Sequence, residues 1–232
     1  MMHKIFFLYK SKSSLKIYFY FLRTKLLNIF FKRKIIHLKK KHEALIRNKK
    51  ITNNYFSSHS FNFYWYLSIL NSNFNYLEIG SYEGNSAMFV ANNFKKSNVY
   101  CVDTWVKTKE YTNHISFSHI EDNFDFNTKK YKNIYKSKDT SDNFFFKNKK
   151  TYDVIYIDGH HLGSQVYKDC KNAWKFLKNG GILICDDYIW NFYKNIENNP
   201  CFVINKFLKE NRGNYKIQKI SNSQIFIKKI NL

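Results

Sequence analysis

The fold of this chain is decided by YLEIGSYEGNS, the stretch at residues 76–86. Its first four residues are predicted to form a short strand that runs into Gly80, and residues 85–94 are predicted to form a helix. The connection has the form E-x-G-x-x-x-G, and a turn this tight needs glycine where φ is positive or where the backbone approaches a ligand. The stretch therefore predicts a strand, a tight turn and a helix in succession.

Outward from this turn, strand and helix patterns alternate. Strands are predicted at residues 76–79, 98–102, 133–135, 152–157 and 182–185. A helix is predicted at residues 166–177, with Gly180-Gly181 as its C-terminal stop, and residues 215–220 and 224–230 indicate a hairpin. The chain is therefore predicted to be an α/β protein with a Rossmann-like, doubly wound, mostly parallel sheet and a C-terminal antiparallel hairpin.

The composition describes a folded and strongly basic chain. Of its 232 residues 44% are hydrophobic and 19% aromatic, which excludes a disordered chain. Lys and Arg number 39 against 17 Asp and Glu, for a net charge of +22. Residues 1–50 carry 15 of the basic residues and one acid, so they are predicted to be a basic amphipathic helical extension, with residues 51–232 as the main domain.

Three explanations of this charge remain open. The chain is rich in Lys, Asn, Ile, Phe and Tyr, as an AT-rich coding sequence would produce, so much of the charge is explained as a composition bias. Alternatively, residues 1–50 contact an anionic membrane surface, where each Lys or Arg contributes about 1 kcal/mol. Binding to nucleic acid is disfavoured, because the chain has no recognisable RNA-binding module.

The sequence favours a cytoplasmic location, with peripheral contact at a membrane surface as the alternative. The best candidate for a membrane span, residues 15–31, is interrupted by Arg23 and Lys25 and falls short of the ~18 apolar residues that a spanning helix needs. The four cysteines show neither CxxC spacing nor a dense framework, which indicates reduced thiols.

The glycine turn and the second strand point to a nucleoside ligand. In the dinucleotide fingerprint GxGxxG the second glycine, here position 82, leaves bare backbone for a pyrophosphate, and Tyr82 fills that space. A nicotinamide cofactor is therefore disfavoured. Asp103 ends the second predicted strand 23 residues after Gly80, where a carboxylate can accept both ribose hydroxyls. An ordinary turn followed by a surface aspartate is the alternative.

Three carboxylates follow two of the predicted strands. Asp158 comes after residues 152–157, and Asp186 and Asp187 come after residues 182–185. Carboxyl ends of parallel strands meet at one edge of a sheet, where each close pair of carboxylates would repel by ~4 kcal/mol. A proton, a basic partner or a divalent cation must offset this repulsion, and oxygen ligands suit Mg²⁺ or a similar cation. Alternatively, these acids only cap a helix and anchor a turn.

Four motifs resemble those of the class I S-adenosylmethionine-dependent methyltransferases, in the same order. They are EIGSYEG at 78–84, CVDTW at 101–105, IYIDGHH at 155–161 and GGILICDDY at 180–188. More narrowly, the chain resembles the small-molecule O-methyltransferases of the macrocin O-methyltransferase type. The resemblance covers about residues 76–190, and residues 1–50 have no counterpart in it.

The resemblance implies S-adenosyl-L-methionine as the cofactor. Its methionine part would lie at the Gly80 turn, its ribose at Asp103 and its adenine near Trp105 and residues 137–139, although Trp105 is equally explained as a core residue. The implied cofactor contacts are Glu78, Gly80, Ser81, Tyr82, Gly84, Asp103, Thr104, Trp105, Ser137 and Asp139.

The resemblance also implies a metal site and a catalytic pair. Asp158, Asp186 and Asp187 are the implied ligands of Mg²⁺ or a similar divalent cation. Asp158 and His161 are the implied catalytic residues, since His161 matches the family's Asp-Gly-x-His pattern and a histidine can take a hydroxyl proton near neutral pH. The alternative for a histidine here, and especially for His160, is a hydrogen bond to a backbone carbonyl or to Asp187.

The expected activity is methyl transfer to a hydroxyl of a small molecule or glycosylated metabolite, assisted by a divalent metal. Two rivals remain: an RNA methyltransferase that uses the basic arm, and a non-catalytic, membrane-associated protein with a cofactor fold. The first lacks the Asn/Asp-Pro-Pro-Tyr/Phe type of motif for a flipped base, and the intact turn and carboxylates oppose the second. Residues 1–70, 106–130 and 188–200 are expected to shape the acceptor pocket, and an oligomer is compatible with the sequence.

Overall fold

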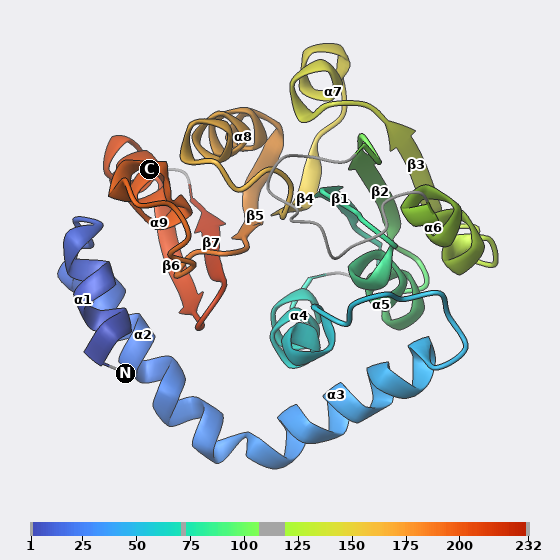
Figure 1. Cartoon of the computed structure of the whole chain (residues 1–232), viewed down its shortest axis with the longest axis horizontal. Coiled ribbons are helices and arrows are strands. Elements are labelled where there is room, and N and C mark those ends of the chain that lie inside the picture. The colour runs from blue at the N-terminus through green and yellow to red at the C-terminus, as the bar shows by residue number, and fades with distance from the viewer. Residues whose placement is uncertain (1, 71–72, 107–118, 231–232) are drawn as a thin grey trace. The chain divides into compact units, whose positions relative to one another are not determined.

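A computed structural model describes residues 2–70, 73–106 and 119–230 of the chain. In this part of the chain the strands form one mixed sheet in the order β3-β2-β1-β4-β5-β7-β6 (Figure 1). The strands are β1 (Asn75–Ile79), β2 (Asn98–Asp103), β3 (Ile134–Lys138), β4 (Tyr152–Ile157), β5 (Leu177–Cys185), β6 (Tyr215–Ile220) and β7 (Ile225–Lys229). The predicted α/β fold, mostly parallel with an antiparallel C-terminal hairpin, is confirmed.

Helices precede the sheet and alternate with its strands. They are α1 (Met2–Lys10), α2 (Leu15–Phe30), α3 (Lys32–Ile46), α4 (Ser60–Leu67), α5 (Asn85–Asn93), α6 (Ile120–Thr128), α7 (Ser141–Lys147), α8 (Gly163–Phe176) and α9 (Pro200–Glu210). Two short 3₁₀ turns, Ser57–His59 and Ile196–Asn198, precede α4 and α9. The chain divides into two compact units, one of residues 30–144 and one of residues 1–29 with 145–232.

In the unit of residues 30–144, three parallel strands carry the glycine turn. β1 pairs with β2 and β2 pairs with β3, so that Leu77 lies opposite Tyr100 and Cys101 lies opposite Lys136. β1 is buried after its first residue, as expected for a strand covered on both faces, and α5 packs against β2. The turn between β1 and α5 is therefore held at the carboxyl edge of a packed sheet.

In the other unit, β4 and β5 are parallel, whereas β5, β7 and β6 are antiparallel neighbours. α8 packs on β4 and β5 and against α9 (Figure 1). The backbone N–H of Asp186 donates to the carbonyl of Ile157 at 2.9 Å. The residues that follow β4 and β5 are therefore side by side, as the sequence predicts for the carboxyl ends of two parallel strands.

Gly180 and Gly181 do not end a helix, contrary to the prediction. α8 ends at Phe176, Leu177 is already extended with φ −78° and ψ 127°, and both glycines lie inside β5. The pairing of β4 with β5 shifts register there, between Tyr152 and Val154. A Cβ at Gly181 would lie 2.8 Å from the carbonyl oxygen of Lys178 and 2.9 Å from that of Asp153, so glycine is required where the irregular start of β5 approaches β4 and not by a helix end.

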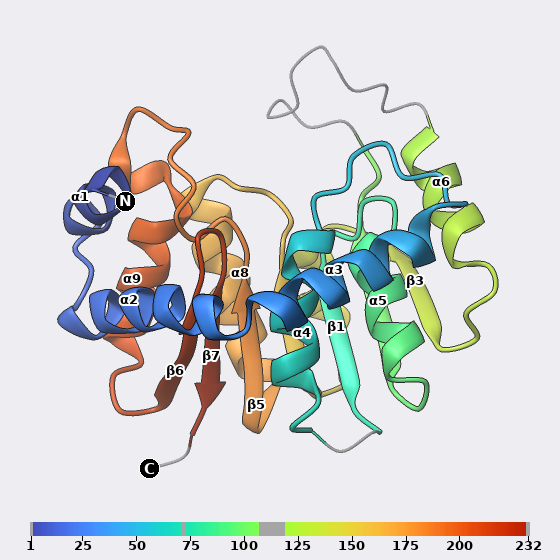
Figure 2. The same cartoon turned by 90° about the horizontal axis from the view of Figure 1, so that it is seen from below.

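The predicted helical character of residues 1–50 is confirmed by α1, α2 and α3. α3 packs on α4 within the unit of residues 30–144. α1 and α2 belong with α9 and the β6–β7 hairpin in the other unit (Figure 2). The domain boundary between residues 50 and 51 stays a prediction. Of residues 106–130, which are expected to help shape the acceptor pocket, residues 107–118 lie outside the described residues.

Two further findings concern the whole described part of the chain. Every helix in it is too short or too polar to span a bilayer. The four cysteines are buried free thiols, and the sulfur atoms of Cys170 and Cys185 are 3.7 Å apart.

Candidate active site

The turn after β1 depends on its two glycines. Gly80 and Gly84 have φ values of 88° and 78°, in the left-handed region that favours glycine. A Cβ at Gly84 would also lie 2.8 Å from Cγ2 of Thr128. The amide of Gly84 donates to the carbonyl of Ser81 at 2.8 Å, which closes the turn. Both glycines singled out in the sequence are therefore needed by the backbone itself.

Asp103, at the end of β2, fixes this turn from the neighbouring strand. One carboxylate oxygen accepts the amide N–H of Tyr82 at 2.9 Å, and the other accepts the amide N–H of Trp105 at 2.8 Å. Tyr82 and Trp105 have positive φ values of 47° and 49°, which are uncommon for non-glycine residues. Each carboxylate oxygen keeps a further lone pair, so Asp103 can still accept hydrogen bonds from a ligand.

Glu78 places a second carboxylate under the turn. Its side chain is fully buried and accepts a hydrogen bond from the Tyr76 hydroxyl at 2.9 Å. Burial is the main cause that raises the pKa of Glu78 to about 7, and the negative charge of Asp103 adds to it. A cationic ligand group at this position would stabilise the ionised form of Glu78.

The turn is also held by residues that the sequence analysis did not single out. Glu83 accepts hydrogen bonds from the amide of Thr52 at 2.6 Å and from the side-chain amide of Asn123 at 2.8 Å. The buried His42 in α3 contacts Oδ1 of Asn85 through Nε2 at 2.6 Å. These contacts link segments 31 to 43 residues apart, and no local pattern in the sequence predicts them.

The contacts of Trp105 are those of a buried structural residue. Its indole N–H donates to the carbonyl of Tyr82 at 2.8 Å, and its ring lies 4.9 Å from that of Phe124. The amine of Lys136 lies 4.7 Å above the same ring. These contacts support the turn, and the predicted contact with adenine stays a prediction.

The other predicted cofactor residues lie around the ends of β1, β2 and β3. Ser81 is buried in the turn, and Thr104 accepts the amide of Val106 at 3.3 Å. Ser137 lies opposite Val102 in the sheet, and the amide of Asp139 donates to the carbonyl of Asp103 at 3.0 Å. The structure thus brings the predicted cofactor residues to one edge of the three parallel strands.

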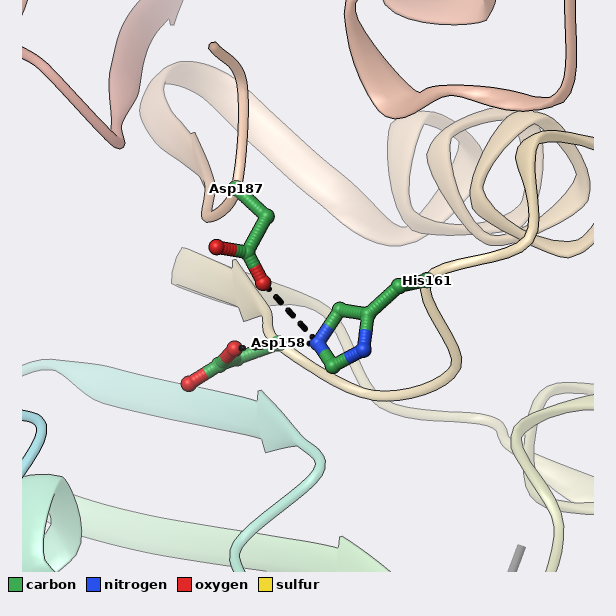
Figure 3. Close-up of side chains that lie close together, drawn as sticks. All are labelled: Asp158, His161 and Asp187. Carbon is green, nitrogen blue, oxygen red and sulfur yellow. Dashed lines mark ion pairs between the residues drawn. The ribbon is translucent and has the colours of Figure 1, made fainter. Parts of the chain in front are cut away.

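The second group of predicted site residues follows β4 and β5 (Figure 3). Nε2 of His161 lies 3.0 Å from Oδ2 of Asp187 and 3.9 Å from Oδ1 of Asp158. These three residues offer ligand atoms that all lie within 4.8 Å of one another. The structure therefore joins the predicted base His161 to two of the three predicted metal ligands.

Asp186 lies outside this group, because its oxygens have other partners. Oδ1 accepts the amide N–H of Asp187 at 2.8 Å, and Oδ2 accepts from the side-chain amide of Gln224 at 3.1 Å and from the Tyr156 hydroxyl. The same hydroxyl lies 2.8 Å from Oδ2 of Asp158. A tyrosine hydroxyl has one proton, so it cannot donate to both carboxylates at once.

The contact of one tyrosine hydroxyl with two acids agrees with the charge balance of the cluster. Desolvation and the negative charges of Asp186 and Asp187 raise the pKa of Asp158 to about 8, against the opposing effect of His161. Without a cation, one proton is therefore retained among these acids near neutral pH.

Tyr156 and Gln224 are site residues that the sequence analysis missed. A signal existed for Tyr156: side chains alternate along a strand, so Tyr156 and Asp158 point to the same side. Gln224 precedes β7, 38 residues away from Asp186, and only the folded hairpin brings it close.

An aromatic cluster adjoins His161. The ring of Trp190 meets that of His161 edge-on at 5.1 Å and stacks on Phe192 at 4.8 Å, with 6° between the ring planes. His160 points elsewhere: it is exposed and accepts the amide N–H of Leu162 through Nδ1 at 3.1 Å. Only the second histidine of the pair therefore belongs to the cluster.

The part of the chain that is similar to known proteins includes both the glycine turn and the cluster after β4 and β5. Residues 77–188 match the family model described as a methyltransferase domain. None of the curated protein sequences matches the chain significantly.

Solved structures of low sequence identity share the fold. A proposed caffeoyl-CoA O-methyltransferase from Staphylococcus aureus has 18% identity and a TM-score of 0.57, over 90% of this chain and 99% of its own. TomG from Streptomyces achromogenes, an O-methyltransferase of tomaymycin synthesis solved with SAM, has 8% identity and a TM-score of 0.58, over 84% and 90%. MycE of the mycinamycin pathway, solved with Mg, SAH and mycinamycin VI, has 11% identity and a TM-score of 0.58, over 82% of this chain and 54% of its own.

The matched region starts within β1 and ends just after Asp187. It thus contains the glycine turn, Asp103 and the cluster of Asp158, His161 and Asp187. The family match and the fold together identify residues 77–188 as a methyltransferase domain of the class I, S-adenosylmethionine-dependent type.

Proposed function

We propose that this chain transfers the methyl group of S-adenosylmethionine to a hydroxyl of a small molecule, with the help of a divalent cation. The observation that carries this proposal is the grouping of Asp158, His161 and Asp187, with ligand atoms within 4.8 Å of one another. A hydroxyl must lose its proton as its oxygen attacks the methyl carbon, and such a group suits that task.

The cofactor is assigned to the turn after β1. Glu78 offers a buried carboxylate to the ammonium group of the methionine part, and Asp103, already oriented by two backbone amides, offers its remaining lone pairs to the ribose hydroxyls. The positive φ values of Gly80 and Gly84 set the backbone path of this turn. The other proposed contacts are Ser81, Tyr82, Thr104, Trp105, Ser137 and Asp139.

The residues after β4 and β5 fit a hard divalent cation such as Mg²⁺. Asp158 and Asp187 supply carboxylate oxygens. Burial, followed by the negative charges of Asp186 and Asp187, raises the pKa of Asp158, and a cation would stabilise its ionised form. Asp186, whose side chain accepts hydrogen bonds from Tyr156 and Gln224, is proposed to orient the neighbouring metal ligands without binding the cation itself. A bound cation would stabilise the deprotonated form of the acceptor hydroxyl. The presence of Mg in the solved MycE structure is a property of that protein that supports this choice.

Asp158 and His161 are proposed to accept the proton that the substrate hydroxyl loses. A pKa of about 8 leaves Asp158 mostly protonated near neutral pH, so a bound cation would have to displace that proton before the carboxylate could accept the proton of the substrate hydroxyl. His161, 3.0 Å from Asp187, is oriented by that acid, which also stabilises the charged imidazolium. The proton therefore has two neighbouring acceptors.

Trp190 and Phe192 are proposed to bind the acceptor molecule. Their rings are stacked, Trp190 touches His161, and the side chain of Phe192 is 54% exposed. A stacked aromatic pair beside the proton acceptor suits a substrate with a ring of its own, such as a phenol or a sugar-bearing metabolite.

The proposal is tested by calorimetric titration with S-adenosylhomocysteine, with and without Mg²⁺, followed by transfer of labelled methyl groups to hydroxyl compounds and to RNA. We expect binding of S-adenosylhomocysteine in both conditions and Mg²⁺-dependent labelling of a hydroxyl compound. Labelling of RNA alone would favour a nucleic-acid methyltransferase. Failure to bind S-adenosylhomocysteine would favour a non-catalytic protein.

A further inference from the structure

Helices α1 and α2 expose large apolar side chains to solvent. These side chains, here called the outer apolar face, are between 45% and 87% exposed: Met2, Phe6, Tyr9, Leu15, Phe19, Leu22, Leu26 and Ile29. Several of them line a hollow of about 760 Å³, together with Ile5 and Tyr18. Apolar side chains gathered in this way on one surface mark a binding site.

The opposite face of the same helices is docked on the fold. Phe7, Leu8, Ile17 and Phe21 are at most 3% exposed. The side-chain amide of Asn205 in α9 donates to the carbonyl of Ser11 at 2.9 Å. Figure 2 shows α1 and α2 beside α9 and the β6–β7 hairpin. The outer apolar face is therefore presented by an anchored pair of helices and not by a loose arm.

The charged residues of the segment that carries this face have one sign. Residues 1–29 contain Lys4, Lys10, Lys12, Lys16, Arg23 and Lys25 and no acid. Lys10, Lys12, Lys16 and Arg23 are exposed. Basic residues interleaved with Phe and Leu on short helices are the composition of segments that lie in the interface of a bilayer.

We propose that the outer apolar face docks on a bilayer that contains anionic phospholipid. The apolar side chains enter the boundary between headgroups and acyl chains, and the lysines and Arg23 pair with lipid phosphates. A second copy of the chain fits less well, because a two-fold contact between these faces would place six cations against six cations without an acid in either segment. Nucleic acid would engage the cations and leave the aliphatic side chains in water. The proposal involves no residue of the active site and is independent of the proposed function.

Flotation of the full chain with lipid vesicles tests this proposal. We expect binding to phosphatidylcholine vesicles that contain roughly one third phosphatidylglycerol to be at least tenfold tighter than binding to phosphatidylcholine alone. The double variant Phe6→Glu/Phe19→Glu is expected to lose at least tenfold in affinity. Phe146→Glu, at an 89% exposed phenylalanine on α7, is the matched control and should stay within twofold.

A second pair of variants separates the role of charge. Lys10→Glu/Lys16→Glu should weaken binding to anionic vesicles by about tenfold, and Lys96→Glu/Lys149→Glu, with the same change of net charge elsewhere, should weaken it far less. Should Phe6→Glu/Phe19→Glu fold poorly by circular dichroism, Leu15→Ser/Leu26→Ser replaces it. The proposal is overturned by equal losses in test and control variants, or by a dimer that depends on this face in light scattering while vesicles do not bind. Binding to RNA without binding to vesicles overturns it as well.

Discussion

The turn after β1 and the cluster after β4 and β5 handle negative charge in opposite ways. Asp103, which fixes the turn from the end of β2, receives a backbone N–H on each carboxylate oxygen. Asp158 in the cluster shares the single proton of Tyr156 with Asp186 and lies near Asp187. Backbone N–H groups therefore stabilise the charge of Asp103 beside the turn. In the cluster the hydrogen-bond donors do not neutralise all of the negative charge, and a proton or a cation is needed to balance it.

The two regions share a local sequence motif. Both strands carry a tyrosine two residues before an acid, Tyr76 before Glu78 and Tyr156 before Asp158, and in each pair the hydroxyl contacts the carboxylate. The pKa of Glu78 rises to about 7, chiefly through burial, and that of Asp158 rises to about 8 through desolvation and neighbouring acids. The same local motif thus serves two different electrostatic environments.

Replacing the acid of the cluster should have the largest effect. Asp158→Asn is expected to lower methyl transfer by about 10³-fold, because it removes a proton acceptor and a proposed ligand of the cation. Affinity for S-adenosylhomocysteine should stay within about threefold, since the cofactor is assigned to the turn. Labelled-methyl transfer and calorimetry measure the two quantities.

Asp153→Asn is the control for this variant. Asp153 lies on the same strand, where its carboxylate pairs with Lys178 at 2.9 Å, and activity should be nearly unchanged. If Asp158→Asn and Asp153→Asn are equally active, Asp158 has no part in the reaction.

Glu78→Gln isolates the effect of burial in the turn. The pKa of Glu78 is about 7 in the folded chain against an ordinary value of 4.5, so the folded state binds its proton more tightly. The free energy of unfolding should therefore fall by about 3 kcal/mol as the pH rises from 4.5 to 7 and change little from this cause outside that window. The variant should lack this decline.

Urea denaturation without cofactor, at several pH values, measures the difference between wild type and Glu78→Gln. Glu197→Gln, at an exposed glutamate, is the control and should show the wild-type dependence on pH. A parallel decline in wild type and Glu78→Gln would assign the pH dependence to other groups.

Asp103→Asn should weaken S-adenosylhomocysteine binding by about ten- to hundredfold, since an asparagine keeps one acceptor oxygen and loses the charge. Affinity for Mg²⁺ should not change, because Asp103 is not among the grouped residues Asp158, His161 and Asp187. Calorimetric titration with each ligand distinguishes the two effects. Asp125→Asn, at an exposed acid paired with Lys136, should behave like wild type, and a matching loss there would point to net charge as the cause.

The smallest expected effect concerns the competition between a cation and a proton in the cluster. Because the pKa of Asp158 is about 8, the apparent affinity for Mg²⁺ should rise by at most about tenfold per pH unit from about pH 6 and level off above about pH 8. Calorimetry in two buffers of different ionisation enthalpy should detect the released proton. Asp158→Asn should flatten the dependence, and an unaltered slope would exclude Asp158 as the group that titrates.

Local pattern was sufficient for much of the fold and part of the site. Apolar β-branched runs predicted β4, and glycine spacing predicted the turn at Gly80 and Gly84, because strand burial and positive φ are properties of a few consecutive residues. The side-by-side placement of Asp158 and Asp187 also followed from the pairing of parallel strands.

Other features were decided only by the tertiary structure. Asp186 is turned toward Tyr156 and Gln224, Gly181 lies where two strands approach closely, and Thr52 holds Glu83 in the turn. Each depends on which distant side chain or carbonyl satisfies a given polar group or fills a given space. A hydrogen bond between residues 30 or more positions apart leaves no periodicity in the sequence, so it becomes visible only once the chain has folded.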